Sequence, residues 1–418
     1  MLVLKVVSPM RTVSIAFVVS IIILSVLQSA RAVDGTFDLG ETVFDPSEKF
    51  YDKTKSPFIF GVGVGYTDNY NPLLEEDVKS SSLSATGKGN LVTKQEEYWF
   101  EAKYLVQTSQ FQLADNLIEQ SDSFSTFDLG LNNRVFLDQR WSVDLNARYT
   151  DFDERIGSGI SQFRQGIAEN DSASIAQLSA SVTYGADRAY RSIQFTVVKS
   201  IRDYDDVNVY SNSFDLEQDV VSLYSNFRLS DQTQLIALVE YRKLTYEFAP
   251  SLNSNYFRFL TGTEWLPGGK SKVLALIGAY QRRYDTIDNT SGVNWELAID
   301  LYPREDMLFS LGSERRSTSG ENNENSFDTI EEEHIAEWLY FYSDQWRFGL
   351  TAKLRRLKYQ ELLQDGTADD LNYGLSTQIN LSDHSVVNIL IGTNELKDET
   401  RGVDATQNSI GVSWQYEF

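Results

Sequence analysis

The sequence predicts an all-β fold: a transmembrane antiparallel up-and-down β-barrel of about 18 strands, with about 16 as the alternative count. Three observations indicate it. Apolar and polar residues alternate with a period of two in segment after segment, which gives each segment one apolar and one polar face. Short turns alternate with longer acidic loops. The chain ends on Ser409–Phe418, in which three aromatic residues share one face.

The first 32 residues have the features of a secretory signal peptide. Lys5 and Arg11 supply a basic region, residues 13–27 are apolar, and Ala30-Arg31-Ala32 offers small residues at a cleavage site. An uncleaved helical anchor is the alternative, but the apolar run is shorter than the ~20 residues that a spanning helix needs. We therefore expect three parts: residues 1–32 as a cleaved signal peptide, 33–57 as a periplasmic N-terminal extension, and 58–418 as the outer-membrane barrel.

Composition argues against several classes of function. The chain has 37 basic and 60 acidic side chains and a formal net charge of −23, which falls to about −26 when the three basic residues of the leader are removed. Such acidity argues against a nucleic-acid partner, because nucleic-acid binding needs a basic surface. The chain has no cysteine, so we expect neither disulfides nor thiolate chemistry.

The alternation assigns the two faces of each expected strand. In residues 346–355, Trp346, Phe348 and Leu350 lie on one face, and Arg347, Lys353 and Arg355 lie on the other. The apolar faces would meet in a core in a soluble sandwich and would face lipid in a membrane barrel. The weakest segments are 81–92, which is rich in Ser and Gly, and 272–284, which is apolar on both faces. The segments begin near residues 58, 81, 97, 126, 141, 174, 192, 217, 233, 255, 272, 292, 306, 332, 346, 371, 386 and 408.

The connections distinguish the two ends of the barrel. Four short turns share an aspartate that can accept hydrogen bonds from the backbone: Leu137-Asp138-Gln139, Ser230-Asp231-Gln232, Ser343-Asp344-Gln345 and Ser382-Asp383-His384. Longer, acidic connections lie between them: 69–79, 153–172, 205–215, 318–328, 360–370 and 397–407. This asymmetry is typical of periplasmic turns and extracellular loops. A propeller has a similar repeat but would place four shorter strands in each period.

Aromatic residues are expected to form a girdle at each membrane interface. The residues proposed for them are Trp141, Trp265 and Trp346 beside short turns, and Tyr66, Tyr149, Tyr241 and Tyr280 near the loops.

Catalysis is not expected, and neither is a cofactor. The chain has two histidines, His334 and His384, and the spacing around neither of them suggests a Ser-His-Asp arrangement. The acidic runs, among them Glu331-Glu332-Glu333 and Asp369-Asp370, are interpreted as loops; a solvated surface is favoured over cation binding.

The polar faces predict a slightly cationic lumen. Ten basic residues face inward: Lys103, Arg134, Arg148, Arg202, Arg228, Arg242, Arg258, Arg347, Lys353 and Arg355. Seven acidic residues do so: Glu101, Asp128, Asp144, Glu240, Glu264, Glu296 and Asp300. Basic residues in a pore can guide an anionic solute, whereas opposed charges can also simply neutralise each other. The pore-lining residues we predict are Arg148, Arg242, Arg258, Arg347, Lys353, Arg355, Glu240, Glu296 and Asp300.

The last strand resembles the C-terminal signal that the barrel assembly machinery reads, with a soluble edge strand as the alternative. The residues of its apolar face are Ile410, Val412, Trp414, Tyr416 and Phe418.

The mature chain as a whole resembles a family of outer-membrane β-barrel porins associated with exopolysaccharide production. The resemblance rests on the polar lead-in, the glycine-rich start FIFGVGVGYTDNYN at residues 58–71, and the terminal SIGVSWQYEF. It implies a location in the outer membrane of a Gram-negative bacterium, in contact with lipid and lipopolysaccharide. It further implies a conduit or accessory barrel for polysaccharide, with secretion components as partners and no catalytic residues. The alternative is a non-conducting structural or adhesin-type barrel, plugged by bulky inward residues such as Leu238, Leu260 and Phe341.

Overall fold

The computed structural model describes most of the chain from Phe58 to the C-terminus. The expected signal peptide and N-terminal extension, residues 1–57, lie outside the described residues. The described residues are 58–69, 79–95, 97–112, 123–154, 160, 169–185, 190–205, 210–269, 271–286, 288–319, 326–361, 365–400 and 402–418.

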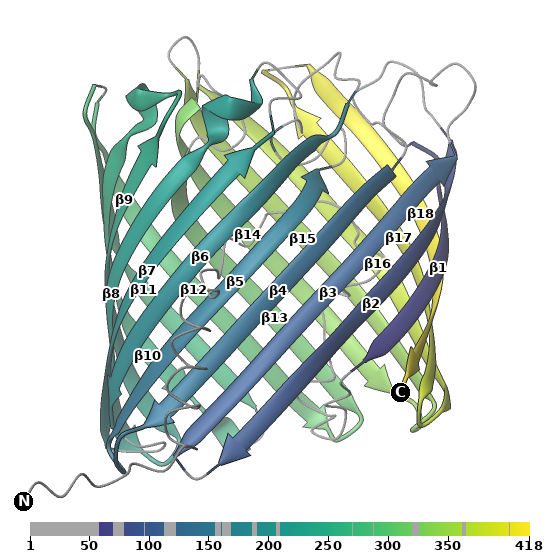
Figure 1. The fold of residues 1–418 in the computed structure, drawn as a ribbon, viewed down its shortest axis with the longest axis horizontal. Helices are drawn as coiled ribbons and strands as arrows, with labels where there is room; N and C mark the ends of the chain where they lie inside the picture. The colour runs from purple at the N-terminus through teal and green to yellow at the C-terminus, as the bar shows by residue number, and fades with distance from the viewer. Residues whose placement is uncertain are drawn as a thin grey trace, which may run out of the picture.

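Within these residues, eighteen antiparallel strands form one sheet that closes on itself (Figure 1). Each strand pairs with its neighbours in sequence, and β18 pairs with β1 to complete the barrel. The strands are β1 (Ile59–Thr67), β2 (Ser80–Gln95), β3 (Tyr98–Gln112), β4 (Ser123–Phe136), β5 (Trp141–Glu154), β6 (Asp171–Tyr184), β7 (Arg191–Tyr204), β8 (Leu216–Ser230), β9 (Thr233–Tyr246), β10 (Ser254–Trp265), β11 (Lys272–Tyr284), β12 (Thr290–Arg304), β13 (Met307–Ser319), β14 (Ser326–Phe341), β15 (Trp346–Glu361), β16 (Gly366–Ser382), β17 (Ser385–Asp398) and β18 (Val403–Glu417). Three short 3-10 turns lie between strands: η3 (Ser211–Phe214), η4 (Pro250–Leu252) and η5 (Pro267–Gly269).

The wall has the two faces that the alternation predicts. On β7, Ile193, Phe195 and Val197 point outward with 45%, 46% and 43% of their surface exposed. No helix in the described part of the chain is long and apolar enough to cross a membrane. A closed barrel satisfies its backbone polar groups within the wall and can therefore present an apolar outer surface to lipid. The fold and its surface are those of an integral barrel of the Gram-negative outer membrane.

Strand boundaries agree with the predictions at one end of the barrel and differ at the other. At the short-turn end, the odd-numbered strands begin within one residue of the predicted positions. At the loop end, β14 begins at Ser326 rather than 332, β16 at Gly366 rather than 371, and β18 at Val403 rather than 408. Pairing there continues beyond the apolar band, as where Arg316 lies opposite Glu331. Apolar alternation reports lipid contact, so it ends before the strand does.

The short turns are hairpins, but in three of the four the capping residue is not the aspartate. The Asp138 carboxylate accepts hydrogen bonds from the backbone N–H groups of Arg140 and Trp141, at 2.6 and 2.8 Å, as predicted. In the other three turns the preceding serine hydroxyl accepts from the backbone instead. These serines are Ser230, Ser343 and Ser382. A serine two residues before the N–H group forms the same kind of turn.

Aromatic rings gather on the outer face near both ends of the strands. At the short-turn end, the Trp141 and Tyr184 rings lie 4.9 Å apart. The prediction that Tyr280 belongs to the outer girdle is wrong. It faces inward, 5% exposed, and pairs with Gly292, whose missing side chain leaves room for the ring. Because β11 is apolar on both faces, its sequence does not show which face points inward.

Candidate functional site: the charged inner wall

The inner wall holds its charged side chains mainly as ion pairs. Five of these pairs are Arg134–Asp144 at 2.5 Å, Lys103–Glu101 at 3.6 Å, Lys272–Glu264 at 2.7 Å, Lys353–Glu333 at 3.1 Å and Arg355–Asp370 at 3.6 Å. Strand register produces several of them directly. Arg134 lies opposite Asp144 on the next strand, and Arg355 lies opposite Asp370. Such pairs keep charged side chains folded along the wall.

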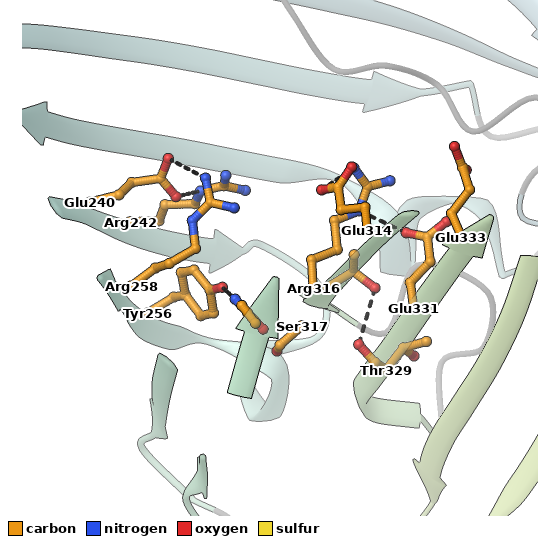
Figure 2. A network of polar contacts seen from close by, with 12 residues as sticks. Glu240, Arg242, Tyr256, Arg258, Glu314, Arg316, Ser317, Thr329, Glu331 and Glu333 are labelled. Atoms are coloured by element: carbon orange, nitrogen blue, oxygen red, sulfur yellow. Dashed lines mark hydrogen bonds and ion pairs between the residues drawn. The ribbon is translucent and has the colours of Figure 1, made fainter. Parts of the chain in front are cut away.

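A denser group lies on β9–β11, and Figure 2 shows four of its members, Glu240, Arg242, Tyr256 and Arg258. Together with Arg282, which lies opposite Tyr256 on β11, we call them the arginine–tyrosine cluster. The Glu240 carboxylate accepts from Arg242 at 2.5 Å and from Arg258 at 3.2 Å. The Arg242 and Arg282 guanidinium carbons lie 5.7 and 5.1 Å from the centre of the Tyr256 ring, within cation–π range. The cluster thus gathers three guanidinium groups around one carboxylate and one ring.

Hydrogen bonds and stacking fix the tyrosine of this cluster. Tyr280 stacks on Tyr256 at 5.8 Å, and the Asn294 side-chain amide donates to the Tyr256 hydroxyl at 2.8 Å. Arg282 donates to the backbone carbonyl of Ser317 at 3.2 Å. The ring is thereby held between two arginines.

A second group on β13 and β14, the acidic ladder, consists of Glu314, Arg316, Glu331 and Glu333 (Figure 2). Arg316 contacts Glu331 at 2.8 Å and Glu314 at 3.4 Å. Glu314 lies opposite Glu333, so two like charges face each other across the strands, and Lys353 pairs with Glu333 at 3.1 Å. Here carboxylates outnumber the arginine between them.

The acidic ladder corrects two of our predictions. The prediction that Glu331-Glu332-Glu333 forms a loop is wrong, because these residues lie within β14, with Glu332 on the outer face. Asp369-Asp370, also predicted as a loop, lies within β16. The predicted cationic excess therefore does not hold on β13 and β14, where the inward carboxylates outnumber the arginine between them. Inward charged residues that the predicted set lacks include the acidic Glu314, Glu331, Glu333, Glu337 and Asp370 and the basic Lys272, Arg282 and Arg316. For Glu331 and Glu333 the cause is the early start of β14, because an acidic run in a loop is not assigned to either face of a strand.

The predicted pore-lining residues all lie on inward-facing positions, but only some of them come together. Glu240, Arg242 and Arg258 form one cluster. Arg148 lies elsewhere on the wall, where its Nε and Nη2 atoms both donate to the Asp128 carboxylate, Nη2 at 2.8 Å. Arg347 lies over the Phe341 ring at 5.6 Å, and Asp300 accepts a hydrogen bond from the Ser310 hydroxyl at 2.7 Å. Glu296 lies opposite Glu314, a residue of the same charge, in the pairing of β12 with β13. Their role in conduction stays a prediction.

At the loop end, the η3 turn packs against residues of the barrel wall. Phe214 of η3 is fully buried against Ala173, Tyr204 and Ile160. The Asp171 carboxylate accepts from the hydroxyls of Tyr210 and Ser211, each at 2.8 Å, and so fastens η3 to β6.

Glu154 lies under the same packing, at the last residue of β5 and above the membrane-spanning part of that strand. Burial raises the pKa of Glu154 to about 7, although hydrogen bonds from the Ile160 N–H and the Tyr204 hydroxyl favour the carboxylate.

The last strand is paired on both sides, with β17 and with β1, which rules out the edge-strand alternative. Ile410, Val412, Trp414 and Phe418 point outward with 44%, 40%, 37% and 68% of their surface exposed. The Phe418 ring packs on Phe58 at 5.3 Å, where the barrel closes. Recognition of this strand by the assembly machinery stays a prediction.

Among known proteins, this chain is similar to solved structures of β-barrels. No family model and no curated protein matches the sequence. The FrpB iron transporter from Neisseria meningitidis aligns with a TM-score of 0.46 and 11% identity over 82% of this chain; the alignment covers 62% of the FrpB chain, so this chain spans less than two thirds of its length. OpdK from Pseudomonas aeruginosa gives 0.46 and 10% over 86% of this chain and 98% of its own. A BenF-like porin from Pseudomonas fluorescens gives 0.47 and 11% over 87% and 99%. The likeness is confined to the barrel fold.

Proposed function

We propose that this barrel is a passive, porin-like outer-membrane channel for small polar solutes. The observation that carries the proposal is the inner wall, where charged residues on β3–β5, on β9–β11 and on β13–β16 are held as ion pairs inside an apolar outer surface. Barrels of ~16–18 strands are wide enough to enclose an aqueous channel. Two of the bulky inward residues, Leu238 and Leu260, pack with Ile236 and Leu276 along the wall of β9–β11, which weakens the plugged alternative.

For the solute we propose an anion, small or polymeric. The arginine–tyrosine cluster supports this choice, because it places more positive than negative charge at one level of the wall. Passage of exopolysaccharide rests on the family resemblance alone and is the most specific form of the proposal. In that form, polysaccharide secretion components would dock at the short-turn face, lipid and lipopolysaccharide would surround the wall, and the assembly machinery would read the last strand.

Planar-bilayer conductance of refolded residues 33–418, with the reversal potential measured in a salt gradient, tests the proposal. We expect steady single-channel conductance with weak anion preference, since most wall charges are paired. Strong cation preference would contradict the anion proposal. A barrel that is folded by circular dichroism and heat-modified migration, yet carries no current, would favour the non-conducting structural or adhesin-type alternative.

A further inference from the structure

In the described part of the chain, three neighbouring hairpins at the loop end close in the same way. The strands β7, β9 and β11 each end on a buried tyrosine at an inward position: Tyr204, Tyr246 and Tyr284. The backbone N–H group of each tyrosine donates to the side chain that immediately precedes the next strand. The acceptors are Asp215, Asn253 and Asn289, at 2.7, 2.7 and 3.2 Å. Each acceptor thus satisfies an N–H group at the point where the pairing of the two strands ends.

In the first two of these hairpins, a 3-10 turn places an apolar side chain against the tyrosine. Phe214, the last residue of η3, is fully buried against Tyr204 and Ala173. Leu252, the last residue of η4, is 3% exposed and packs against Tyr246. Tyr204 and Ala173 are paired residues of the inner face, and Tyr246 lies on the inner face of β9. The two turns therefore form a second layer on the lumen side of β6–β9.

Hydrogen bonds from two strands hold η3 in this layer. On β6, the Asp171 carboxylate accepts from the hydroxyls of Tyr210 and Ser211. On β7, the Arg202 guanidinium donates through Nε and Nη2 to the Phe214 carbonyl, at 3.3 and 3.1 Å. Hydrogen bonds to charged groups are among the stronger ones in proteins, so η3 has a defined position against the wall.

We propose that this layer narrows the extracellular mouth of the barrel and sets the largest solute that passes. We call it the tyrosine shelf, and it consists of η3 and η4 together with Tyr204 and Tyr246. The charged inner wall acts on the charge of a solute, whereas a second layer of chain reduces the width that is open to every solute. The inference rests on the proposed function, because a size limit requires passage.

Entry of uncharged sugars into liposomes that contain the refolded barrel tests the shelf, because it reports size without charge. Phe214→Ala removes the ring that seats η3 on the wall. We expect it to raise the entry rate of raffinose relative to arabinose by roughly twofold, and to raise single-channel conductance as well. The control is Leu260→Ala, which removes an equally buried apolar side chain midway along β10, where it packs with Ile236 and Leu276. This control should leave the ratio of the two sugars unchanged.

A second pair of variants leaves the packing of the shelf intact. Ser213→Cys places a thiol on a half-buried position of η3, in a chain that has no cysteine of its own. Its control is Thr245→Cys, which places the thiol on a half-buried position of the outer face, next to Tyr246. We expect a bulky methanethiosulfonate reagent to reduce the current by roughly half in Ser213→Cys and to leave Thr245→Cys unchanged.

The outcomes separate the shelf from the channel. The shelf is refuted, and the channel stands, if the barrel conducts but folded Phe214→Ala keeps the original sugar ratio, or if Leu260→Ala changes that ratio equally. Equal loss of current after labelling at Ser213→Cys and Thr245→Cys would refute the shelf in the same way. Folded barrels that pass neither sugar nor current in any variant would refute the channel, and the size limit with it.

Discussion

The assignment of faces predicts opposite outcomes for one substitution made at two adjacent positions. Val197 and Val198 follow each other on β7, with Val197 outward and 43% exposed and Val198 inward. On the outer face, Val197 lies six residues from Arg191 and two from Lys199, which pairs with Glu217 and Asp219. At a rise of about 3.3 Å per residue and a tilt of about 40°, these gaps correspond to about 15 Å and about 5 Å, which places Val197 in the loop-side half of the apolar band.

An arginine on the lipid face costs about 2–4 kcal/mol at the midplane and about 0–1 kcal/mol near the interfaces, so we expect Val197→Arg to cost about 1–3 kcal/mol. Val198→Arg keeps the same side-chain change and the same strand but directs the charge to the hydrated interior, so we expect it to cost less than about 1 kcal/mol. Reversible unfolding in lipid bilayers, followed by tryptophan fluorescence against guanidinium concentration, gives both free energies. Equal costs, or a larger cost for Val198→Arg, would show that the faces are wrongly assigned or that the interior is dry.

Three further results are expected. Ser343→Ala should destabilise the barrel by about 1 kcal/mol in the same unfolding assay while Asp344→Ala has little effect, because the serine hydroxyl accepts the turn's backbone hydrogen bonds; the reverse order would contradict the turn assignment. The folded-state pKa of Glu154 is raised to about 7, so its stabilising contribution is complete below about pH 4.5 and lost as pH rises through about 7. Amide protection factors around Glu154, which are corrected for the intrinsic pH dependence of exchange, should therefore be highest below about pH 4.5 and fall as pH rises through about 7, with no such trend in Glu154→Gln. Tyr359→Phe should cost about 1–2 kcal/mol, since the buried hydroxyl donates to Asp398 at 2.9 Å, whereas Tyr373→Phe, which loses an exposed bond to Glu395, should cost less than about 0.5 kcal/mol.

The sequence could predict the number of strands, their faces and their short-turn ends because all three follow from contact with lipid. Lipid imposes an apolar side chain at every second position, so a segment such as Trp346–Leu354 shows its face without any knowledge of its neighbours. The same reasoning explains the errors. Above the lipid both faces are polar, and the first residues of β14, β16 and β18 resemble loops although they are paired in the wall.

The inner wall was less predictable because its chemistry depends on register between strands. A short turn fixes the register of the two strands that it joins. β10 and β11 are joined across η5, so the pairing of Tyr256 with Arg282 follows from counting residues outward from that turn. A long connection does not. β9 and β10 are joined through η4, whose own packing, with Leu252 buried against Tyr246, decides how the two strands meet.

The arginine–tyrosine cluster therefore depends on both kinds of connection. Its β10–β11 half is fixed by a tight turn, whereas its β9–β10 half, including the Glu240 pair, is fixed by a folded loop at the opposite end of the barrel. A change of one residue in the η4 connection that shifted this register would turn the inward side chains of β9 outward, which lipid contact forbids. The register can thus shift only in steps of two, and each such step would carry Arg242 past Tyr256 and separate Glu240 from Arg258. Contact with lipid fixes which residues of β9 face inward, but it does not fix how far β9 is shifted along β10. The packing of η4 therefore sets the position of these charges within the lumen, and the membrane does not.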